Sequence, residues 1–516
     1  MKRRDWVLVG LAMASAGVYL AWSAAFGARG FALDDAWIHQ VYARNLGTLG
    51  EFAFFPGQPS AGSTSPLWTI LLSLGYVFRL DFQVWSYLLG ALLLCATALV
   101  TSRLTLRLTD GRYPRLVFLI PVFVLFEWHL AWSAVSGMEI PLFVFLSVFL
   151  LERFYAAEQV SQTPRIARGL VLGVIAGLLT LTRPEGLVLG VLVGMAEAIR
   201  SWNAKGRGHS LTKDQNDSLP GTPASDLVRG AWVRVLIQFA FGYAILMIPY
   251  LIFNLATSGT ILPNTFYAKN VEYASLFEQA PFLVLWLQLL AVPWVGAQVL
   301  LLPGLLFVGF TLARKREWLA LIPLAWVLIL PALYAARLPV AYQHGRYEMP
   351  IIPFILIYGA WGTAMLFERI RVRVLRTAWV ASTGVLIVLF WLLGANAYAT
   401  DVAIIDCEMV QTARWVSLNA PADAVVAAHD IGALEYFYPR AFIDMAGLVT
   451  PDVIPFMRDE GRLLDYLLAR HATLAIFFPD WYPALASDAR FVPLHQTDCA
   501  VTREAGGTNL TVYRLQ

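Results

Sequence analysis

The sequence predicts a polytopic α-helical membrane protein with a small extracytoplasmic α/β domain at its C-terminus. Of its 516 residues, 58% are hydrophobic and only 14% are charged, whereas soluble globular proteins carry about 25% charged residues. Long apolar runs recur along the chain, and a polar segment follows the last of them. A chain of this composition is expected to fold in a lipid bilayer.

Eleven apolar runs have lengths that suit transmembrane helices, which need about 20 residues. The first run follows the basic start Met1-Lys-Arg-Arg and is long enough to be retained, whereas a signal peptide has a shorter apolar core and a cleavage site of small residues. The runs lie at 6–26, 82–106, 114–134, 138–156, 168–182, 184–200, 231–256, 281–312, 317–336, 348–368 and 377–398.

Clusters of Lys and Arg between the runs predict the orientation, because basic residues accumulate in cytoplasmic loops. The clusters lie at 103–115, 165–168, 200–234, 314–316 and 369–376. Eleven spans that begin at a cytoplasmic N-terminus place all of these clusters inside. The segments that then fall outside are 27–81, 135–138, 257–280, 337–347 and everything after 398.

Two segments need separate treatment. Pro66–Arg79 is apolar but only about 14 residues long, which is short for a crossing. If it crossed, the arginine clusters would lie outside, so we expect a juxtamembrane or re-entrant helix at the outer surface, within the first outer loop at 27–81. The polar, turn-rich loop 201–230 predicts a flexible cytoplasmic linker.

The chain divides into a transmembrane domain at 1–398 and a tail domain at 399–516. Short strands are expected in the tail domain at 425–428, 441–443, 474–478 and 510–513, with a helix within 461–470. Cys407 and Cys499 bracket this domain. If the domain lies outside the cytoplasm, a disulfide between them could tie its ends together. Cys95 lies in an apolar run and is expected to be a packing residue.

Acidic residues gather in the predicted outer segments. Asp34 and Asp35 directly follow the first span. Such a pair can bind a divalent cation, or one carboxylate can act as a base while the other sets its pKa. A helix N-terminus with a favourable dipole is the structural alternative. Glu139 stands at the outer end of a span, and Arg183 and Glu185 interrupt an apolar stretch, where an ion pair is the competing explanation.

Two predicted outer loops contain cations, although Lys and Arg usually accumulate on the cytoplasmic side. Their presence outside therefore suggests a specific role. Lys269 lies in Pro263-Asn264-Thr-Phe-Tyr267-Ala-Lys269, and Arg346 lies in His344-Gly-Arg346-Tyr347. Binding of a phosphate group would explain both, and salt bridges to loop carboxylates are the alternative. Carboxylates and cations on one outer face beside lipid suit an amphiphilic phosphate substrate.

The order of motifs resembles the GT-C superfamily of polyprenyl-phosphate-sugar-dependent glycosyltransferases, and most closely the branch with the bacterial terminal arabinofuranosyltransferases. The resemblance covers most of the chain and rests on the combination of weak motifs. These are Asp34-Asp35-Ala-Trp-Ile, Tyr42-Ala-Arg44-Asn45, Ser63-Thr-Ser-Pro66-Leu-Trp68, Ser136-Gly-Met-Glu139-Ile-Pro, Leu181-Thr-Arg183-Pro-Glu185-Gly, the two cationic loops, His429-Asp430-Ile-Gly-Ala-Leu and Ile443-Asp444-Met-Ala-Gly-Leu.

This resemblance implies a bacterial inner-membrane enzyme that transfers a sugar with inversion from a polyprenyl-phosphate donor to an extracytoplasmic glycan, lipid or protein. It implies that Asp34 deprotonates the acceptor hydroxyl, while Asp35 orients Asp34 or binds acceptor or metal. Lys269, Arg346 and His344 are the candidates for the leaving phosphate. Candidates for contacts with the sugar or acceptor, or for support of the site, are His39, Arg44, Glu139, Arg183, Glu185, Asn264, Tyr267 and Tyr347.

Two other classes of function fit the composition. A lipid or polysaccharide transporter would carry polar residues deep in several helices, whereas here they lie at outer ends. An assembly protein without catalysis would tolerate loss of Asp34. The discriminating test is spatial, because a transferase requires Asp34, Lys269 and Arg346 to face one cavity.

Overall fold

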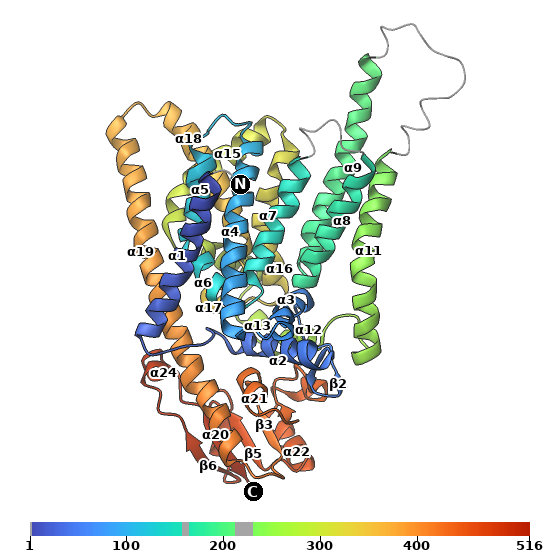
Figure 1. The fold of residues 1–516 in the computed structure, drawn as a ribbon, viewed down its shortest axis with the longest axis vertical. Coiled ribbons are helices and arrows are strands. Elements are labelled where there is room, and N and C mark those ends of the chain that lie inside the picture. The colour runs from blue at the N-terminus through green and yellow to red at the C-terminus, as the bar shows by residue number, and fades with distance from the viewer. Residues whose placement is uncertain (1–2, 157–164, 212–230) are drawn as a thin grey trace, which may run out of the picture.

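The computed structural model describes residues 3–156, 165–211 and 231–516. A layer of long helices makes up most of the molecule, and the tail domain lies at one end of it (Figure 1). The C-terminus lies in the tail domain, and the chain begins within the helical layer, toward the opposite end. The predicted class of a helical membrane protein with a small α/β domain is confirmed.

Seven helices in the described ranges are long and apolar enough to cross a membrane, and nine spans result if two bent pairs each count as one. The bent pairs are α5 (Leu116–Phe126) with α6 (Trp128–Val135), and α12–α13 (Asn264–Glu272, Leu276–Gln279) with α14 (Phe282–Ala291). The seven centre on α1 (Arg3–Ala25), α4 (Phe82–Leu108), α11 (Ala231–Ser258), α15 (Leu302–Arg314), α16 (Ile322–Arg337), α18 (Ile352–Arg369) and α19 (Arg373–Ile405).

Helices also form at the three remaining predicted positions, although they do not reach these limits of length and apolarity within the described residues. They are α7 (Ile140–Ala156), α8 (Arg165–Thr182) and α9 (Gly186–Leu211). Helix α9 continues through 201–211, where a flexible linker was expected, and 212–230 lie outside the described residues.

The predicted span 281–312 is wrong, because the chain breaks inside it. Helix α14 ends at Ala291, and two short 3₁₀ helices, η2 (Val292–Trp294) and η3 (Ala297–Leu301), precede α15. Pro293 lacks the N–H that a helix needs, and Gly296 has a φ of 154°. The segment Ala297–Arg314, which includes α15, qualifies as a span by itself, whereas α14 pairs with α12–α13 across a bend of 108°.

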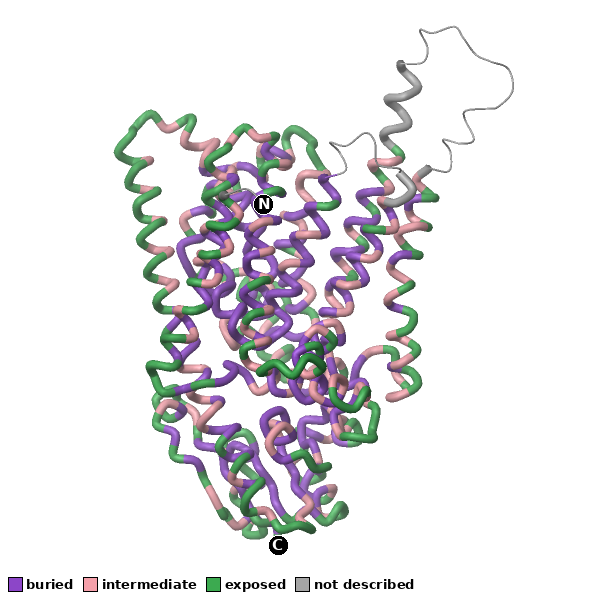
Figure 2. Tube along the Cα trace, viewed as in Figure 1, coloured by how far each residue is buried: buried purple, intermediate pink, exposed green. Residues whose placement is uncertain are grey.

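Burial in the helical layer is uneven. The central helices are largely buried, whereas α11 and α19 carry many exposed positions (Figure 2). These positions are apolar, for example Ile237 on α11 and Val385 on α19, which are 63% and 66% exposed. Apolar surface of this extent requires a lipid or protein partner, as expected of a multi-pass membrane protein.

Two short helices lie between the helical layer and the tail domain, namely α2 (Asp34–Leu49) and α3 (Pro66–Val77) (Figure 1). Helix α3 has 12 residues, too few to cross a bilayer, and lies at the end of the layer as charge parity predicted. Trp68 fixes it there by donating from Nε1 to the carbonyl of Gly137 at 3.0 Å. A hairpin of β1 (Ala53–Phe55) and β2 (Gln58–Pro59) joins α2 to α3.

The tail domain contains a five-stranded sheet in the order β4-β3-β5-β7-β6. Strands β4 (Ile443–Asp444), β3 (Val426–Ala428) and β5 (Leu474–Phe477) are parallel, and β7 (Thr511–Leu515) and β6 (Phe491–Gln496) are antiparallel to their neighbours. Strand β6 was not predicted. It contains Pro493 and lies at an edge of the sheet, where proline is tolerated.

The link between the two parts is a helix without a break at residue 398. Helix α19 runs to Ile405 and continues through a π-helical turn, η6 (Asp406–Val410), into α20 (Gln411–Asn419). Cys407 in this turn forms a disulfide with Cys499, as the sequence suggested. Cys95 is a buried free cysteine.

Short helices complete the chain. In the tail domain they are α21 (Gly432–Phe437), η7 (Pro451–Phe456), α22 (Glu460–Ala469), α23 (Pro483–Ser487) and α24 (Ala500–Glu504). Helix α22 is the one expected within 461–470. Elsewhere the short helices are η4 (Trp318–Leu321), α17 (Tyr342–Gly345) and η5 (Met349–Ile351).

Candidate active site

The two aspartates open helix α2, and their side chains reach different partners. The Asp34 carboxylate accepts hydrogen bonds from the backbone N–H groups of Gly432 at 2.7 Å and Ala433 at 2.8 Å. The Asp35 carboxylate pairs with Nη2 of Arg346 at 2.7 Å. Adjacent residues on a helix diverge by about 100°, so one side chain reaches the tail domain and the other reaches a cavity.

Their pKa values shift in opposite directions. Burial raises the pKa of Asp34 to about 6, although the hydrogen bonds from Ala433 and Gly432 oppose the shift. Burial acts in the same sense on Asp35, but the charges of Arg346 and Lys269 outweigh it, so the pKa of Asp35 lies below its ordinary value. Asp35 is therefore ionised at neutral pH.

The cavity beside Asp35 holds about 860 Å³ of space, part of it open to solvent. Its walls come from segments far apart in the sequence: α2, the loops before α3 and α7, the loop after α8, α12 with the residue before it, the segment 337–347, and the tail domain. The predicted site residues that line it are Asp35, His39, Glu139, Arg183, Glu185, Lys269, Arg346 and Tyr347. Asp34 does not line the cavity. A transferase was expected to place Asp34, Lys269 and Arg346 around one cavity, and the structure places Asp35 there instead of Asp34.

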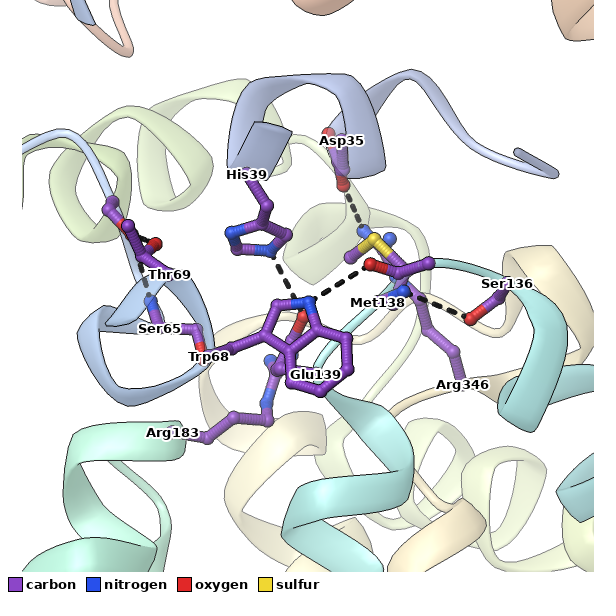
Figure 3. Close-up of polar contacts among 12 residues, drawn as sticks. Asp35, His39, Ser65, Trp68, Thr69, Ser136, Met138, Glu139, Arg183 and Arg346 are labelled. Carbon is purple, nitrogen blue, oxygen red and sulfur yellow. Dashed lines mark hydrogen bonds and ion pairs between the residues drawn. The ribbon is translucent and has the colours of Figure 1, made fainter. Parts of the chain in front are cut away.

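Glu139 connects the buried polar groups of the site, because each of its carboxylate oxygens contacts a different side chain. Its Oε1 lies 2.5 Å from Nη1 of Arg183, and its Oε2 lies 3.2 Å from Nε2 of His39 (Figure 3). Burial disfavours its charge, but the hydrogen bond from His39 and the charge of Arg183 outweigh burial, so the pKa of Glu139 is lowered. Glu139 thus holds two cavity-lining side chains in place.

Arg183 and Arg337 extend this network. Arg183 donates from Nη2 to the Tyr334 hydroxyl at 3.0 Å and lies 3.5 Å from Glu185. The predicted Arg183–Glu185 ion pair is therefore present. Arg337 contacts the other oxygen of Glu185 at 3.4 Å. Arg337 was not singled out from the sequence, although it is a cation in a predicted outer segment, which is the signal that identified Lys269 and Arg346.

Arg346 is a buried cation that keeps unused donors beside the cavity. It is 4% exposed, and its Nη2 donates to Asp35 and, at 2.9 Å, to the Tyr347 hydroxyl. Its Nε and Nη1 have no hydrogen-bond partner among the described residues. Buried polar groups are normally paired, so these N–H groups are available to an anion. Lys269 also lines the cavity and pairs with Glu272 at 2.8 Å.

Besides Asp34, four predicted residues lie outside the cavity lining. His344 contacts Asp401 of α19 at 2.7 Å and packs against the rings of Trp128 and Trp132. Arg44 donates to the carbonyl of Tyr436 at 2.9 Å. Asn264 and Tyr267 belong to α12, where the backbone N–H of Asn264 donates to the carbonyl of Ala61 at 3.2 Å and Tyr267 packs on Phe266.

His344 was expected at the phosphate, and the geometry differs because of the backbone. Gln343 and His344 both have positive φ, of 54° and 60°, which redirects the chain before Arg346. The described residues contain no group of three or more His, Cys, Asp or Glu side chains that could hold a metal ion.

Comparison with solved structures defines the fold. The chain is similar to ArnT from Cupriavidus metallidurans bound to undecaprenyl phosphate, with 14% identity over 99% of this chain and 98% of ArnT, at a TM-score of 0.59. It is also similar to the Archaeoglobus fulgidus oligosaccharyltransferase AglB in complex with an inhibitory peptide and a dolichol-phosphate, with 12% identity over 93% of this chain and 70% of AglB, at a TM-score of 0.56. The chain therefore has the GT-C fold, as its motif order suggested.

Three further comparisons set the limits of that statement. Residues 396–513 match a domain of unknown function (DUF8728), and no curated protein matches the chain. A mycobacterial arabinofuranosyltransferase, AftD, aligns over 42% of its length at a TM-score of 0.43, which is too low to bear on the donor sugar.

Proposed function

We propose that the protein is a membrane glycosyltransferase that moves a sugar from a polyprenyl-phosphate donor to an acceptor hydroxyl outside the cytoplasm, with inversion. The observation that carries the proposal is the pairing of Asp35 with Arg346, which puts a candidate base beside a candidate phosphate ligand in one cavity. The polyprenyl phosphates bound to ArnT and AglB support the donor class.

In this mechanism Asp35 is the base. Its carboxylate takes the proton of the acceptor hydroxyl, and the acceptor oxygen forms a bond to the anomeric carbon. The bond from that carbon to the phosphate oxygen breaks, and the polyprenyl phosphate leaves with the electron pair. Arg346, through its free Nε and Nη1, and Lys269 stabilise the charge of the leaving phosphate.

Donor binding and the basicity of Asp35 are coupled in this arrangement. The charge of Arg346 lowers the pKa of Asp35. A phosphate that binds Arg346 partly neutralises this charge, so the pKa of Asp35 rises and its carboxylate becomes a stronger base. The base is therefore strengthened when the donor is in place.

Asp35 is favoured over Asp34 by the geometry. The sequence resemblance implied that the first residue of the pair is the base. Both oxygens of Asp34 are instead occupied by backbone N–H groups of the tail domain, whereas the Asp35 side chain is 35% exposed and lines the cavity. A base must reach the proton that it removes, and Asp35 meets this requirement.

The proposed location is a bacterial inner membrane with the N-terminus in the cytoplasm and the tail domain outside. The disulfide between Cys407 and Cys499 supports this orientation, because disulfides persist in oxidising compartments. The cavity supports a transferase over a transporter, because its charged residues stand at helix ends. Glu139 precedes α7, Arg183 follows α8 and Arg346 precedes α18, whereas a transporter site is expected near the middle of the helices.

The test uses the full chain in proteoliposomes with a panel of labelled polyprenyl-phosphate sugars. Release or transfer of the sugar is measured for wild type, Asp35→Asn, Asp34→Asn and the surface control Asp452→Asn, whose side chain is 65% exposed. We expect turnover in wild type and in the control, and a loss of about 100-fold or more in Asp35→Asn. Full activity of Asp35→Asn would remove it as the base, and failure of wild type on every donor would contradict the proposed function.

A further inference from the structure

We propose that the tail domain forms the acceptor-side wall of the cavity and that Asp34 is the positioning residue that docks it. This inference rests on the proposed function. It concerns the region that matches a domain of unknown function and the two sequence motifs of that region, at 429–434 and 443–448, which the mechanism leaves unexplained.

The first motif, at 429–434, forms the contact with Asp34 that we call the dock. It contains Gly432, which begins helix α21, and the N–H groups of Gly432 and Ala433 donate to the two oxygens of Asp34. The contact depends on glycine, since a Cβ on Gly432 would lie 2.3 Å from the backbone oxygen of Asp34. The tail domain thus touches the helical turn that carries Asp35.

The rest of α21 extends this dock along α2. Arg44 donates to the carbonyl of Tyr436. The ring of Trp37 lies 5.0 Å from that of Tyr436 and 5.1 Å from that of Phe437, measured between centroids. Helix α2 is therefore held by the tail domain at its first turn and along its length, so a displaced tail domain would move Asp35.

The second motif makes the wall. Asp444 is fully buried and accepts hydrogen bonds from the backbone N–H groups of Ala446 at 2.8 Å and Val449 at 2.7 Å. Gly447, with a φ of 72°, completes the turn. This turn presents Leu448 and Val449 to the cavity, and both line it.

The wall closes tightly against the loop before α3. A Cβ on Gly62 would lie 3.1 Å from both the carbonyl oxygen of Leu448 and Cγ1 of Val449. Gly62 is itself fixed by α12, because the Thr265 hydroxyl donates to its carbonyl at 2.5 Å. No other part of the tail domain lines the cavity among the described residues.

The chemistry of the two sides assigns the substrates. All cavity-lining cations lie outside the tail domain, on the helical layer and its loops, and they suit the phosphate of a lipid that arrives from the bilayer. The tail domain contributes two apolar side chains and lies at the end of the helical layer (Figure 1). A water-borne acceptor must enter past this side, so Leu448 and Val449 are expected to determine which acceptor fits.

The experiment measures how each variant divides the donor sugar between water and an added acceptor. Labelled polyprenyl-phosphate sugar is incubated with the full-length protein and a panel of alkyl glycosides, and the ratio of transfer to hydrolysis is measured. The variants are Leu448→Phe, Val449→Phe and Val449→Ala. Leu494→Phe is the matched control, because Leu494 is 38% exposed on the edge strand β6.

We expect the Phe variants to change the ratio about tenfold, the effect of a small change in the volume of a binding pocket, and the control to leave it unchanged. A variant that fails to fold loses hydrolysis as well as transfer, and Val449→Ala, which only removes atoms, then provides the test. A ratio that stays at the wild-type value in all the wall variants would overturn the wall. Absence of donor turnover in wild type would instead count against the proposed function.

The dock is tested from both of its sides. We expect Asp34→Asn and Gly432→Ala each to lower the ratio of transfer to hydrolysis, and their double variant to be no worse than either one, because both remove one contact. Hydrogen exchange should speed up at the amides of residues 432 and 433 in Asp34→Asn. Unchanged exchange there would overturn the dock, and loss of donor hydrolysis in Asp34→Asn with that unchanged exchange would make Asp34 the base.

Discussion

Replacement of Arg346 by lysine tests the phosphate site while the charge is retained. The Arg346 guanidinium uses Nη2 for Asp35 and the Tyr347 hydroxyl and leaves Nε and Nη1 free among the described residues. Lysine has one ammonium group on a flexible stem and cannot present two separate pairs of donors. In Arg346→Lys, the ammonium can satisfy Asp35 or a phosphate oxygen, but it reproduces neither the fork nor its geometry.

The size of the effect follows from the hydrogen bonds that are lost. A hydrogen bond to a charged group contributes about 1.5–3 kcal/mol. Loss of one such bond to the phosphate corresponds to a roughly 10- to 150-fold weaker affinity. We expect the dissociation constant for undecaprenyl phosphate, measured with a labelled lipid on the protein in nanodiscs, to rise by this factor, with a similar loss in kcat/KM.

Arg470→Lys is the matched control. Arg470 pairs with Asp452 at 3.2 Å on the surface, where both side chains are more than half exposed, and such pairs contribute about 0–1 kcal/mol. The control should bind the lipid as wild type does. If Arg346→Lys also binds it with wild-type affinity while remaining folded, Arg346 does not hold the phosphate and the assignment fails.

Three further predictions concern the supports of the site. Glu139→Gln removes the charge from a buried ion pair, which costs about 3–5 kcal/mol, so the melting temperature should fall clearly, and an unchanged value would contradict the connecting role of Glu139. Reduction of the Cys407–Cys499 disulfide should destabilise the tail domain by about 2–5 kcal/mol and speed its proteolysis ahead of that of the helical layer. With a pKa of about 6 against an ordinary 3.8, Asp34 takes up its proton in the folded state first, so its own contribution to stability rises as pH falls from 6 to 4. Transfer should decline over the same range in wild type and not in Asp34→Asn.

The fold was largely predictable because an apolar run, which marks a membrane helix, is a local property of the sequence. Runs of apolar residues located the helices, and its short length together with charge parity identified α3 as a helix that does not cross. The errors lie where local patterns are ambiguous. Pro293 and Gly296 break a run that is apolar throughout, and Pro493 made an edge strand look like a loop.

The site was only partly predictable. Charged residues in outer segments were found because charge is conspicuous beside lipid, which is how Glu139, Arg183, Lys269 and Arg346 were identified. The direction in which a side chain points, unlike its charge, cannot be read from the sequence. His344 turns toward Asp401 because three residues with positive φ, 343–345, precede Arg346. The apolar wall formed by Leu448 and Val449 could not be recognised in the sequence, because apolar residues in a folded domain usually belong to its core.

The choice between Asp34 and Asp35 shows why a motif alone does not assign a base. Adjacency fixes only that the two carboxylates diverge by about 100°; it does not say which one faces substrate. That is decided by helix α21, whose first N–H groups have no partner within their own helix and need acceptors. Asp34 supplies the acceptors for both, and with Asp34 held in this way the next side chain, that of Asp35, faces Arg346. The tail domain and the proposed base are therefore parts of one arrangement, and a change in the dock should alter catalysis without touching any residue that lines the cavity.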